Sequence, residues 1–547
     1  MKVDFIRKHL MSVRMGALLF LAVGIFLISG QLAGDLRDLD LGHWANPVIE
    51  RFSALGYIKL PAIKPYPRDL IRAQLLAFQE RLGREGISLS PGDSTGLEML
   101  CQELGLAFRP RRIVEGEMLV WGDEQLYASG DFRFLPQASY RRGAEPEYRL
   151  KSDVDIAGGT GGVFIFDQRL SFEVERQRRK VERISGSQMT WRGGRYSVPW
   201  AYLRLRLLDP FPDMGGRPLI ELSAGRMQHW WGRGRQGTLL LSDNAPTFDA
   251  LEFRINYKRI GFQSFVGILS TDQQRFLSGH RATLSLLPGL NVGASEVVLY
   301  QAANIDPVYV NPLLPFYGNQ WNQRDDDNIL WAADLAWQTG KGLDLYGELL
   351  MDDVQYEQNP PAPQKLGFLV GGHWADPLGL RDTDLKWEWA GNQKWVYTQR
   401  RYANRYVGSD TLSPLGHWMG TDADAFGAFI EHRLHPKLNL GLGYSWARKG
   451  QGRIDRGFHY AGEPYAGDRV APGDTAKGCY LGDDPHTAFL SGTVERRDLG
   501  HLYLSWQWQH WLWLYARAWA GRIENSGHQP GASLGDSGGE LKLVVDY

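Results

Sequence analysis

The chain ends in the segment Glu540-Leu541-Lys542-Leu543-Val544-Val545-Asp546-Tyr547. From Leu541 to Tyr547 every second residue is apolar or aromatic, and these side chains share one face of a strand because side chains alternate along extended backbone. The other face carries charge at Glu540, Lys542 and Asp546. The same alternation recurs in successive hairpins earlier in the chain, as in transmembrane barrels. An antiparallel outer-membrane β-barrel is therefore the first interpretation.

Hairpins and connections support this fold class. Residues 502–509 alternate Leu and Trp with polar or Tyr side chains, and residues 512–519 alternate again after a tight turn. Further tight turns are predicted at 287–289, 339–342 and 435–437. The connections at 351–366 and 448–488 are long and polar, and such asymmetry is typical of barrels with short periplasmic turns and longer extracellular loops. About 420 residues at roughly 20 to 25 per strand and connection give about 16 to 20 strands.

The first residues have the pattern of a signal peptide. Four cations, Lys2, Arg7, Lys8 and Arg14, precede the uncharged run 15–29. That run is shorter than the ~20 residues that a membrane-spanning helix needs, but it fits a signal-peptide core. We place the signal peptide at residues 1–34, with cleavage near Gly34, so the chain is predicted to be exported. A membrane-spanning form would then be a barrel.

Composition narrows the class of protein. The chain has 61 basic and 62 acidic residues, and removing residues 1–34 takes away four cations and one anion, which leaves a formal charge of −4. This charge excludes a strongly basic nucleic-acid binder. Twenty Trp, 23 Tyr and 64 Gly fit aromatic girdles and tight turns. Cys101 and Cys479 are far apart and lack metal-ligand spacing, so no bridge and no zinc site are predicted.

Residues 35–110 are predicted to form a small helical periplasmic element, and residues 111–547 the barrel. Asn46 is placed as the cap of a first helix, with Pro47 at its first position and Gly56 at its end. A second helix is predicted to start at Pro67 and to end before Gly83, and a third covers residues 97–104.

The segment Gly42-His43-Trp44-Ala45, the helix after it, Gly56-Tyr57-Ile58 and Pro67-Arg68 resemble part of one S-layer homology repeat. That family often binds cell-wall polymers, so the resemblance implies a cell-wall partner for residues 38–105. The glycine-rich turn usual after the first helix is replaced here by residues 59–62. A periplasmic plug or cap on the barrel is the alternative role, and it is favoured because one incomplete repeat is weak support for binding.

The search for catalytic chemistry gives a negative expectation. The Gly531–Gly535 segment matches a nucleophile-elbow pattern, but no histidine follows it. Glycine-rich residues 158–162 lack the Lys and Ser or Thr of a phosphate loop. Glu348, Asp352 and Asp353 could include a glycosidase pair. The alternating pattern of the strand instead explains these acids as charged side chains that face the lumen or lie at the rim of the barrel.

Two groups of residues could hold a sugar. The first, Trp230, Trp231, Arg233 and Arg235, lies among glycines. The second runs through Tyr317, Trp321, Arg324, Asp325, Asp326 and Asp327. Aromatic rings stack on sugar faces, guanidiniums grip carboxylates, and the acids could hold hydroxyls or a calcium ion. An architectural role in a constriction, turn or girdle explains both groups equally well.

At these residues the chain resembles the capsule assembly protein Wzi family. The resemblance rests on 225–232 with Leu239–Asn244, on Asp326-Asp327-Asn328, and on Leu345–Asp353. It extends over most of residues 35–547. It implies an eighteen-stranded outer-membrane barrel with a helical periplasmic element, which acts as a lectin and helps attach capsular polysaccharide to the cell surface.

The sequence therefore predicts a mostly β, monomeric protein of the cell outer membrane that binds surface or capsular polysaccharide and helps to assemble or retain it. No enzyme activity, cofactor, metal or nucleic-acid partner is expected, whereas outer-membrane lipid and the barrel assembly machinery are expected partners. A porin-like channel for small solutes is the alternative, with inward polar residues lining water. A barrel enzyme that acts on polysaccharide or lipid is a third interpretation.

Overall fold

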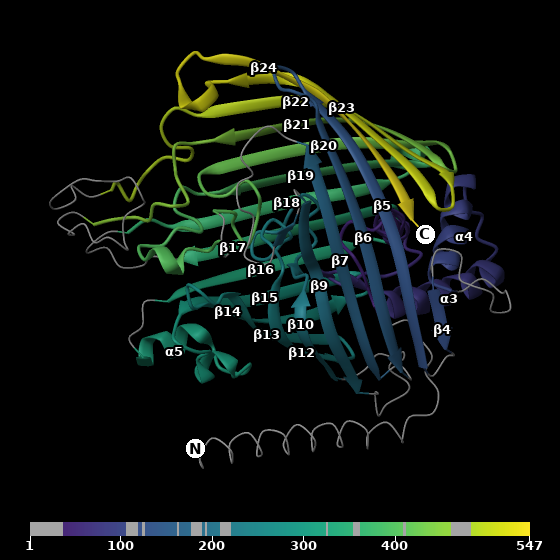
Figure 1. The fold of residues 1–547 in the computed structure, drawn as a ribbon, viewed down its shortest axis with the longest axis horizontal. Helices are drawn as coiled ribbons and strands as arrows, with labels where there is room; N and C mark the ends of the chain where they lie inside the picture. The colour runs from purple at the N-terminus through teal and green to yellow at the C-terminus, as the bar shows by residue number, and fades with distance from the viewer. Residues whose placement is uncertain are drawn as a thin grey trace, which may run out of the picture.

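The computed structural model describes residues 37–105, 119–122, 126–160, 163–176, 189–191, 194–207, 220–323, 327–353, 362–408, 412–460 and 483–546. The described residues form a closed antiparallel β-barrel of eighteen strands, as predicted (Figure 1). The wall strands are β5 (Leu126–Arg141), β6 (Glu147–Thr160), β7 (Phe164–Arg176), β9 (Gly194–Leu207), β10 (Ile220–Met227), β12 (Phe248–Tyr257), β13 (Ile260–Ser270), β14 (Arg275–Leu287), β15 (Leu290–Gln301), β16 (Asn328–Gln338), β17 (Leu343–Asp353), β18 (Lys365–Ala375), β19 (Thr383–Asn392), β20 (Ala423–His435), β21 (Leu438–Lys449), β22 (Glu495–Gln509), β23 (Leu512–Glu524) and β24 (Ser533–Asp546).

The remaining elements are short or lie before the wall. The helices are α2 (Ala45–Ala54), α3 (Arg68–Glu85), α4 (Pro91–Glu103) and α5 (Phe316–Gln323), with single turns η2 (Pro307–Val310), η3 (Pro377–Gly379), η4 (Tyr402–Asn404) and η5 (Ser526–His528). The short strands are β1 (Asp38–Leu39), β2 (Ile63–Lys64), β3 (Tyr66–Pro67), β4 (Leu119–Gly122), β8 (Met189–Trp191) and β11 (Trp230–Trp231). None of the helices in the described part of the chain combines the length and the apolar content needed to cross a membrane.

The two ends of the wall close it into a barrel. The last strand, β24, pairs antiparallel with the first, β5, and this register places Asp546 opposite Arg133 and Gly538 opposite Arg141. Closure leaves no strand edge, so the wall satisfies its backbone hydrogen bonds internally, as a structure in lipid must. Residue Tyr547, with which the chain ends, lies outside the described residues.

The predicted difference between the two barrel ends is confirmed. Several connections at one end are short, at 258–259, 288–289, 339–342, 436–437 and 510–511. At the other end several connections are much longer, at 228–247, 302–327, 393–422 and 450–494. In outer-membrane barrels the short turns face the periplasm and the long connections face the outside of the cell.

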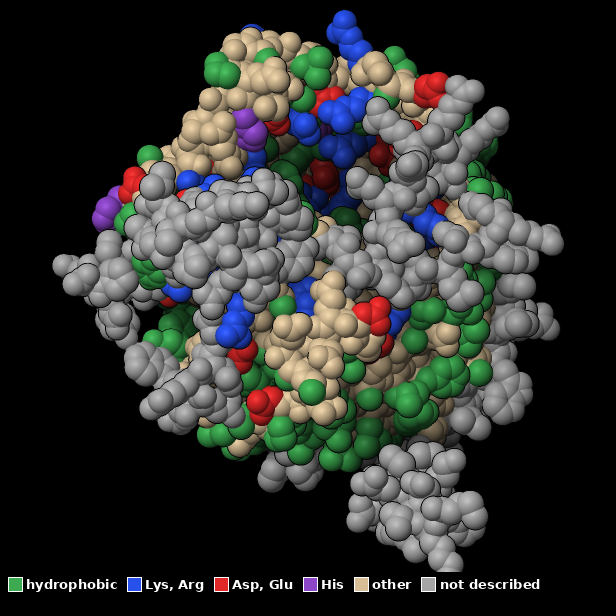
Figure 2. Space-filling model, turned by 60° about the vertical axis from the view of Figure 1, so that its left-hand side comes forward, with side chains coloured by type: hydrophobic (Ala, Val, Ile, Leu, Met, Phe, Trp, Pro, Cys, Tyr) green, Lys and Arg blue, Asp and Glu red, His purple; other side chains and the backbone are tan. Residues whose placement is uncertain are grey.

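Alternation along the strands gives the wall an apolar outside and a polar inside. On β22, the exposed side chains of Leu502, Trp506 and Trp508 lie on one face, while His501 and Gln507 lie buried on the other. Hydrophobic side chains gather along the lower part of the space-filling view (Figure 2). These apolar faces form the band that contacts lipid.

Leu442 on β21 tests this assignment, because its side chain is 56% exposed on the apolar face. Leu442→Arg is expected to lower the free energy of unfolding in lipid by roughly 2 to 4 kcal/mol if the residue lies near the bilayer midplane. Leu442→Ala is the control, since it removes the same contacts without adding charge. Denaturant titration in vesicles measures both variants, and equal stability of the two would contradict a lipid-facing position.

Helices α2, α3 and α4 pack around a core of their own. Its buried side chains include Phe52, Ile71, Leu75, Phe78 and Leu100. The predicted helix limits were wrong in three places. The third helix, α4, begins at Pro91, six residues before the predicted range 97–104. Asn46 does not cap α2 but lies inside its first turn, because its side-chain amide donates to the carbonyl oxygens of Asp40 and Leu41. Helix α3 continues through Gly83 and ends at Gly86, whose φ of 63° suits a left-handed C-cap.

These helices lie against the end of the barrel that carries the short turns (Figure 1). Gly56, after α2, meets the turn at Gly340 so closely that a Cβ on Gly56 would stand 2.8 Å from the Cα of Gly340. The Gly342 N–H donates to the carbonyl oxygen of Ala54 at 2.9 Å. Trp44 stacks on Trp513 of β23 with ring centroids 5.5 Å apart. Backbone and aromatic contacts therefore both fix the helices to the wall.

Candidate functional site

Two long connections fill one side of the barrel lumen. We call residues 228–247, between β10 and β12, the first arm and residues 393–422, between β19 and β20, the second arm. Their buried apolar and aromatic side chains include Trp231, Leu239, Leu240, Leu241, Ala245, Val396, Tyr397, Tyr406, Leu415 and Met419. The Tyr406 hydroxyl donates to the carbonyl oxygen of Leu240 at 2.9 Å, so the arms also bond to each other.

Inward carboxylates of the wall hold these arms. Glu348 on β17 accepts hydrogen bonds from the backbone N–H of Gly234 at 3.3 Å and of Leu239 at 2.8 Å. Asp352 accepts from the Tyr397 N–H at 2.5 Å. Backbone donors that bond to carboxylates form strong, oriented contacts. Glu348 and Asp352, the acids weighed above as a glycosidase pair, therefore bind backbone of the two arms.

The tryptophans of the first predicted site lie deep in the lumen. Trp230 and Trp231 form β11, which pairs antiparallel with Ile63 and Lys64 of β2. Their side chains are 5% and 3% exposed. The first arm therefore reaches down through the barrel and joins the chain segment that leads from α2 to α3.

The arginines of this predicted site strengthen the same junction. Arg233 donates to the Tyr66 hydroxyl at 3.0 Å, and Arg235 forms an ion pair with Glu50 of α2 at 2.6 Å. Lys64 pairs with the same carboxylate at 2.8 Å. Burial acts to raise the pKa of Glu50, but the Lys64 and Arg235 charges outweigh it and hold that pKa well below its usual value. Glu50 thus joins the helices, β2 and the first arm.

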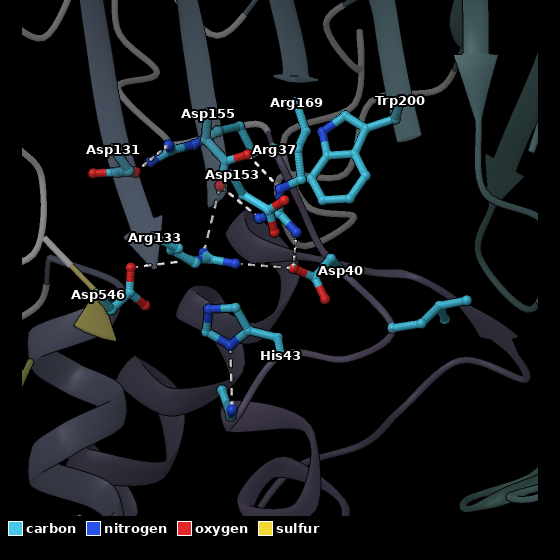
Figure 3. Close-up of polar contacts among 12 residues, drawn as sticks. Arg37, Asp40, His43, Asp131, Arg133, Asp153, Asp155, Arg169, Trp200 and Asp546 are labelled. Carbon is cyan, nitrogen blue, oxygen red and sulfur yellow. Dashed lines mark hydrogen bonds and ion pairs between the residues drawn. The ribbon is translucent and has the colours of Figure 1, made fainter. Parts of the chain in front are cut away.

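An ion-pair network on the lumen side of β24, β5, β6 and β7 binds the segment that follows β1 (Figure 3). Asp40, just after β1, lies 3.3 Å from Arg133 and 3.1 Å from Arg169. Arg133 also binds Asp546 of the last strand at 3.0 Å, and Arg169 stacks over Trp200 at 3.9 Å. Burial acts to raise the pKa of Asp40, but the two arginines outweigh it and lower that pKa. We call this network the floor.

Above the floor, the other side of the lumen is hollow at the end with the long connections. Figure 2 shows a recess near the top of the view, with basic and acidic side chains inside its mouth. Strands β22–β24 lie at the same height in Figure 1. The inward side chains of these strands and of β5 place charged and aromatic groups on the lumen face of the wall.

Five of these inward residues form what we call the recess wall: Tyr503, Arg517, Trp519, Asp536 and Arg141. Arg141 binds both carboxylate oxygens of Asp536, at 2.9 and 2.8 Å. Arg517 lies 5.4 Å from the Tyr503 ring centroid and 5.7 Å from that of Trp519. The side chain of Arg141 is about half exposed, at 51%. Aromatic rings and guanidinium donors are therefore combined at one place, where Arg141 is accessible and the Asp536 side chain, only 3% exposed, fixes it.

This arrangement suits a polar ligand with apolar ring faces. Indole and phenol rings stack on such faces, while guanidinium groups bind carboxylates in a planar fork. Among the residues that the structure describes, no group of three or more His, Cys, Asp or Glu side chains could hold a metal ion.

Comparison with known proteins assigns the family. A family profile described as "Capsule assembly protein Wzi" matches residues 204–495, which is more than half of the chain. The chain belongs to the Wzi capsule assembly family. The profile spans both arms of the Wzi-family lumen, whereas all five residues of the recess wall lie outside it. No curated protein matches the sequence.

One solved structure supports the same fold. The chain is similar to Wzi of Escherichia coli, an outer-membrane protein that is involved in group 1 capsule assembly and is described as a carbohydrate-binding β-barrel. The TM-score is 0.57 at 15% identity, over 94% of this chain and 99% of that chain. OccK1 of Pseudomonas aeruginosa matches with a TM-score of 0.43 and 11% identity, over 76% of this chain and 98% of that one. This Wzi-family chain is an outer-membrane β-barrel protein.

The described residues of the second predicted site, Tyr317 and Asp327, lie on the outside of the Wzi-family barrel, away from the first. Asp327 accepts a hydrogen bond from the Tyr309 hydroxyl at 2.8 Å. Tyr317 packs edge to face on Trp331, with centroids 5.0 Å apart. Arg324, Asp325, Asp326 and the side chain of Trp321 lie outside the described residues. The structure therefore does not bring the two predicted groups together.

Sequence reasoning missed the recess wall. Alternation along 502–509 and 512–519 had already placed Tyr503, Arg517 and Trp519 on the face away from lipid. Arg141 and Asp536 stand 395 positions apart in the chain. Only closure of the barrel brings them together, so no local spacing marks the pair.

Proposed function

We propose that this chain binds surface or capsular polysaccharide and helps to assemble or retain it at the cell surface. Membership in the Wzi capsule assembly family is the observation that carries the proposal. The E. coli protein with the same fold is described as carbohydrate-binding. In our proposal the recess wall contacts the polymer, and the chain acts as a binding protein without covalent chemistry.

The recess wall supplies the groups that such binding requires. Trp519 and Tyr503 offer rings to sugar faces, and Arg517 between them can bind a uronate carboxylate or a hydroxyl. The buried Asp536 carboxylate binds Arg141 through both oxygens and holds its half-exposed guanidinium where it can donate to a sugar hydroxyl or carboxylate. The mouth of the recess opens among the long connections, where an extracellular polymer would arrive.

Trp230, Trp231, Arg233 and Arg235 have an indirect role in this proposal. They join the first arm to β2 and Glu50, and so position the packed side of the lumen next to the recess. The sugar-binding role of Tyr317, Trp321, Arg324, Asp325, Asp326 and Asp327 stays a prediction. Cell-wall binding by residues 38–105 also stays a prediction, and Trp44 from that segment stacks on the barrel.

Changing Arg517 and Trp519 to alanine together tests the proposal. Stacking and charge-assisted bonds contribute on the order of 1 kcal/mol each, so binding should weaken by roughly thirtyfold. The measurement is retention of purified surface polysaccharide by cells that carry heat-modifiable, correctly assembled protein. Arg522→Ala is the matched control, because Arg522 lies on the same strand with its side chain 63% exposed.

Unchanged retention of polysaccharide in the double variant would show that the recess wall is not the binding site.

The channel alternative makes a different prediction, since it requires steady ion current across planar bilayers that hold the native chain. The two arms fill one side of that path and helices α2, α3 and α4 lie against its end with the short turns, so we expect no such current.

A further inference from the structure

The connection between β15 and β16 folds back over the outside of the barrel. It contains η2 and α5, and we call residues 305–323 the flap. In Figure 1, α5 lies beside the wall at the opposite end from α3 and α4. Turn η2 contacts β13, and α5 contacts β15. The flap therefore lies against strands that face lipid elsewhere along their length.

The strand register shows which side of the wall the flap covers. Arg281 on β14 binds Asp334 inside the lumen, so the even-numbered residues of β14 point outward. Phe276 is one of them, and its partners on β15 include Tyr300. Both rings are buried, at 8% and 2% exposure. Tyr309 and Phe316 of the flap pack on them and bury them from outside the barrel.

The flap also covers a polar pair on this outer face. His280 and Glu296 are paired across β14 and β15 on the outward side, with 3.0 Å between His280 Nε2 and Glu296 Oε2. The backbone N–H groups of Phe316 and Tyr317 donate to the Glu296 carboxylate at 2.8 and 3.0 Å. A bare carboxylate on a lipid-facing wall is costly. The start of α5 satisfies this one.

The outer surface of the flap is itself apolar. Residues 307–323 contain no Asp, Glu, Lys or Arg. Five large side chains of the flap are exposed: Ile305 at 39%, Val310 at 43%, Leu313 at 83%, Leu314 at 40% and Tyr317 at 37%. A group of this kind on a protein surface marks contact with another apolar phase.

This apolar surface continues the lipid-facing band of the same strands. Toward the short turns, outward residues Leu284 and Leu286 of β14 are exposed, as are Leu335 and Trp337 of β16. Farther along β14 and β16, toward the long connections, the outward residues are no longer exposed, and the flap covers them from there on. Its outer surface therefore extends the band toward the long connections.

We propose that the flap is a membrane contact whose outer surface lies among the acyl chains of the outer leaflet. Its inner surface seals the polar pair of His280 and Glu296 from lipid, and its outer surface replaces the apolar wall that the pair interrupts. The partner is the hydrocarbon of the outer leaflet itself. This inference does not depend on polysaccharide binding, because the flap and the recess wall lie on opposite sides of the barrel wall.

Spin labelling in reconstituted vesicles tests the proposal. The native cysteines are replaced by Cys101→Ala and Cys479→Ser, and a nitroxide is attached at Leu313→Cys. Collision with oxygen, which concentrates in the acyl region, should exceed collision with a water-soluble nickel chelate several-fold. Leu412→Cys is the matched control, since Leu412 is a 46% exposed leucine in the second arm. At that position the nickel chelate should dominate.

Equal access of the nickel chelate at positions 313 and 412 would place the flap in water and overturn the proposal. Dipolar broadening between labels at position 313 on different molecules would also overturn it, because a second copy of the chain would then cover the surface. If Leu313→Cys fails to assemble, Val310→Cys carries the label with the same expected outcome.

Discussion

Arg51→Met is expected to release helices α2, α3 and α4 from the barrel while the barrel itself stays folded. Arg51 is fully buried and binds Asp93 of α4 at 2.7 Å. Its guanidinium also binds Asp376 at 2.8 Å and Asp384 at 3.2 Å on the barrel. Removing the Arg51 charge leaves the buried carboxylates without a counter-charge, which costs roughly 3 to 5 kcal/mol. The closed barrel satisfies its own backbone and does not need the helices for that purpose.

Limited trypsin digestion of detergent-purified protein measures the release. Cleavage within residues 38–105 should become much faster in the variant, and the barrel fragment should keep its heat-modifiable migration. Arg81→Met is the matched control, because Arg81 pairs with Glu85 on the exposed surface of α3, with side chains 40% and 48% exposed. Exposed pairs of this kind contribute little. Equal digestion of the two variants would show that Arg51 does not hold the helices to the wall.

The barrel could be predicted because its pattern is local. Two-residue alternation and tight turns at 287–289, 339–342 and 435–437 are decided by neighbours in sequence, and the structure places hairpins at all three. The number of strands could be predicted only as a range, because it was obtained from the length of the barrel segment. The limits of α2 and α3 were less predictable, since Asn46 bonds to the preceding loop and Gly86 supplies the left-handed cap.

The inward course of the first arm could not be predicted in the same way. Its residues have no helical or strand period, and its direction is set by distant partners. Glu50 binds Arg235 from 185 positions away, and Glu348 binds Leu239 from 109 positions away. The aromatics and arginines that suggested a surface site belong to this buried junction. Composition shows that such groups can hold a sugar, but only tertiary contacts show whether a sugar can reach them.

The flap illustrates a second reason for the limits of sequence reasoning. Tyr317 was grouped with acids as a candidate ligand contact because aromatic and charged residues are neighbours in sequence there. The structure places Tyr317 on the outside of the wall, where the N–H that it contributes binds Glu296. Glu296 points to the lipid-facing side of β15, where the alternating pattern predicts an apolar side chain, so it breaks the pattern when the strand is considered alone. It is explained only when α5 covers it.

Acid is expected to loosen the helices from the barrel. Burial acts to raise the pKa values of Asp40, Glu50 and Asp93, which bind the barrel wall or the first arm, but nearby cations outweigh it and lower all three. A carboxyl whose folded pKa is depressed stabilises the folded state fully above its unfolded value of about 4, and this stability is lost as the pH falls through the folded value. Burial raises the pKa of Asp69, so that group opposes the trend.

Three carboxyl groups have a lowered pKa and one has a raised pKa, so the docked helices lose stability on balance below about pH 4. Trypsin is inactive there, so the measurement is near-ultraviolet circular dichroism of the stacked Trp44 and Trp513 rings, isolated by difference from Trp44→Phe. Asp93→Asn removes one titrating group and should make the acid transition shallower, because its slope reports the number of protons taken up. Glu98→Gln, on the same helix, is the control. A signal that stays constant to pH 2 or that grows in acid would contradict the assignment of these carboxylates, since protonation would then cost the docked helices nothing.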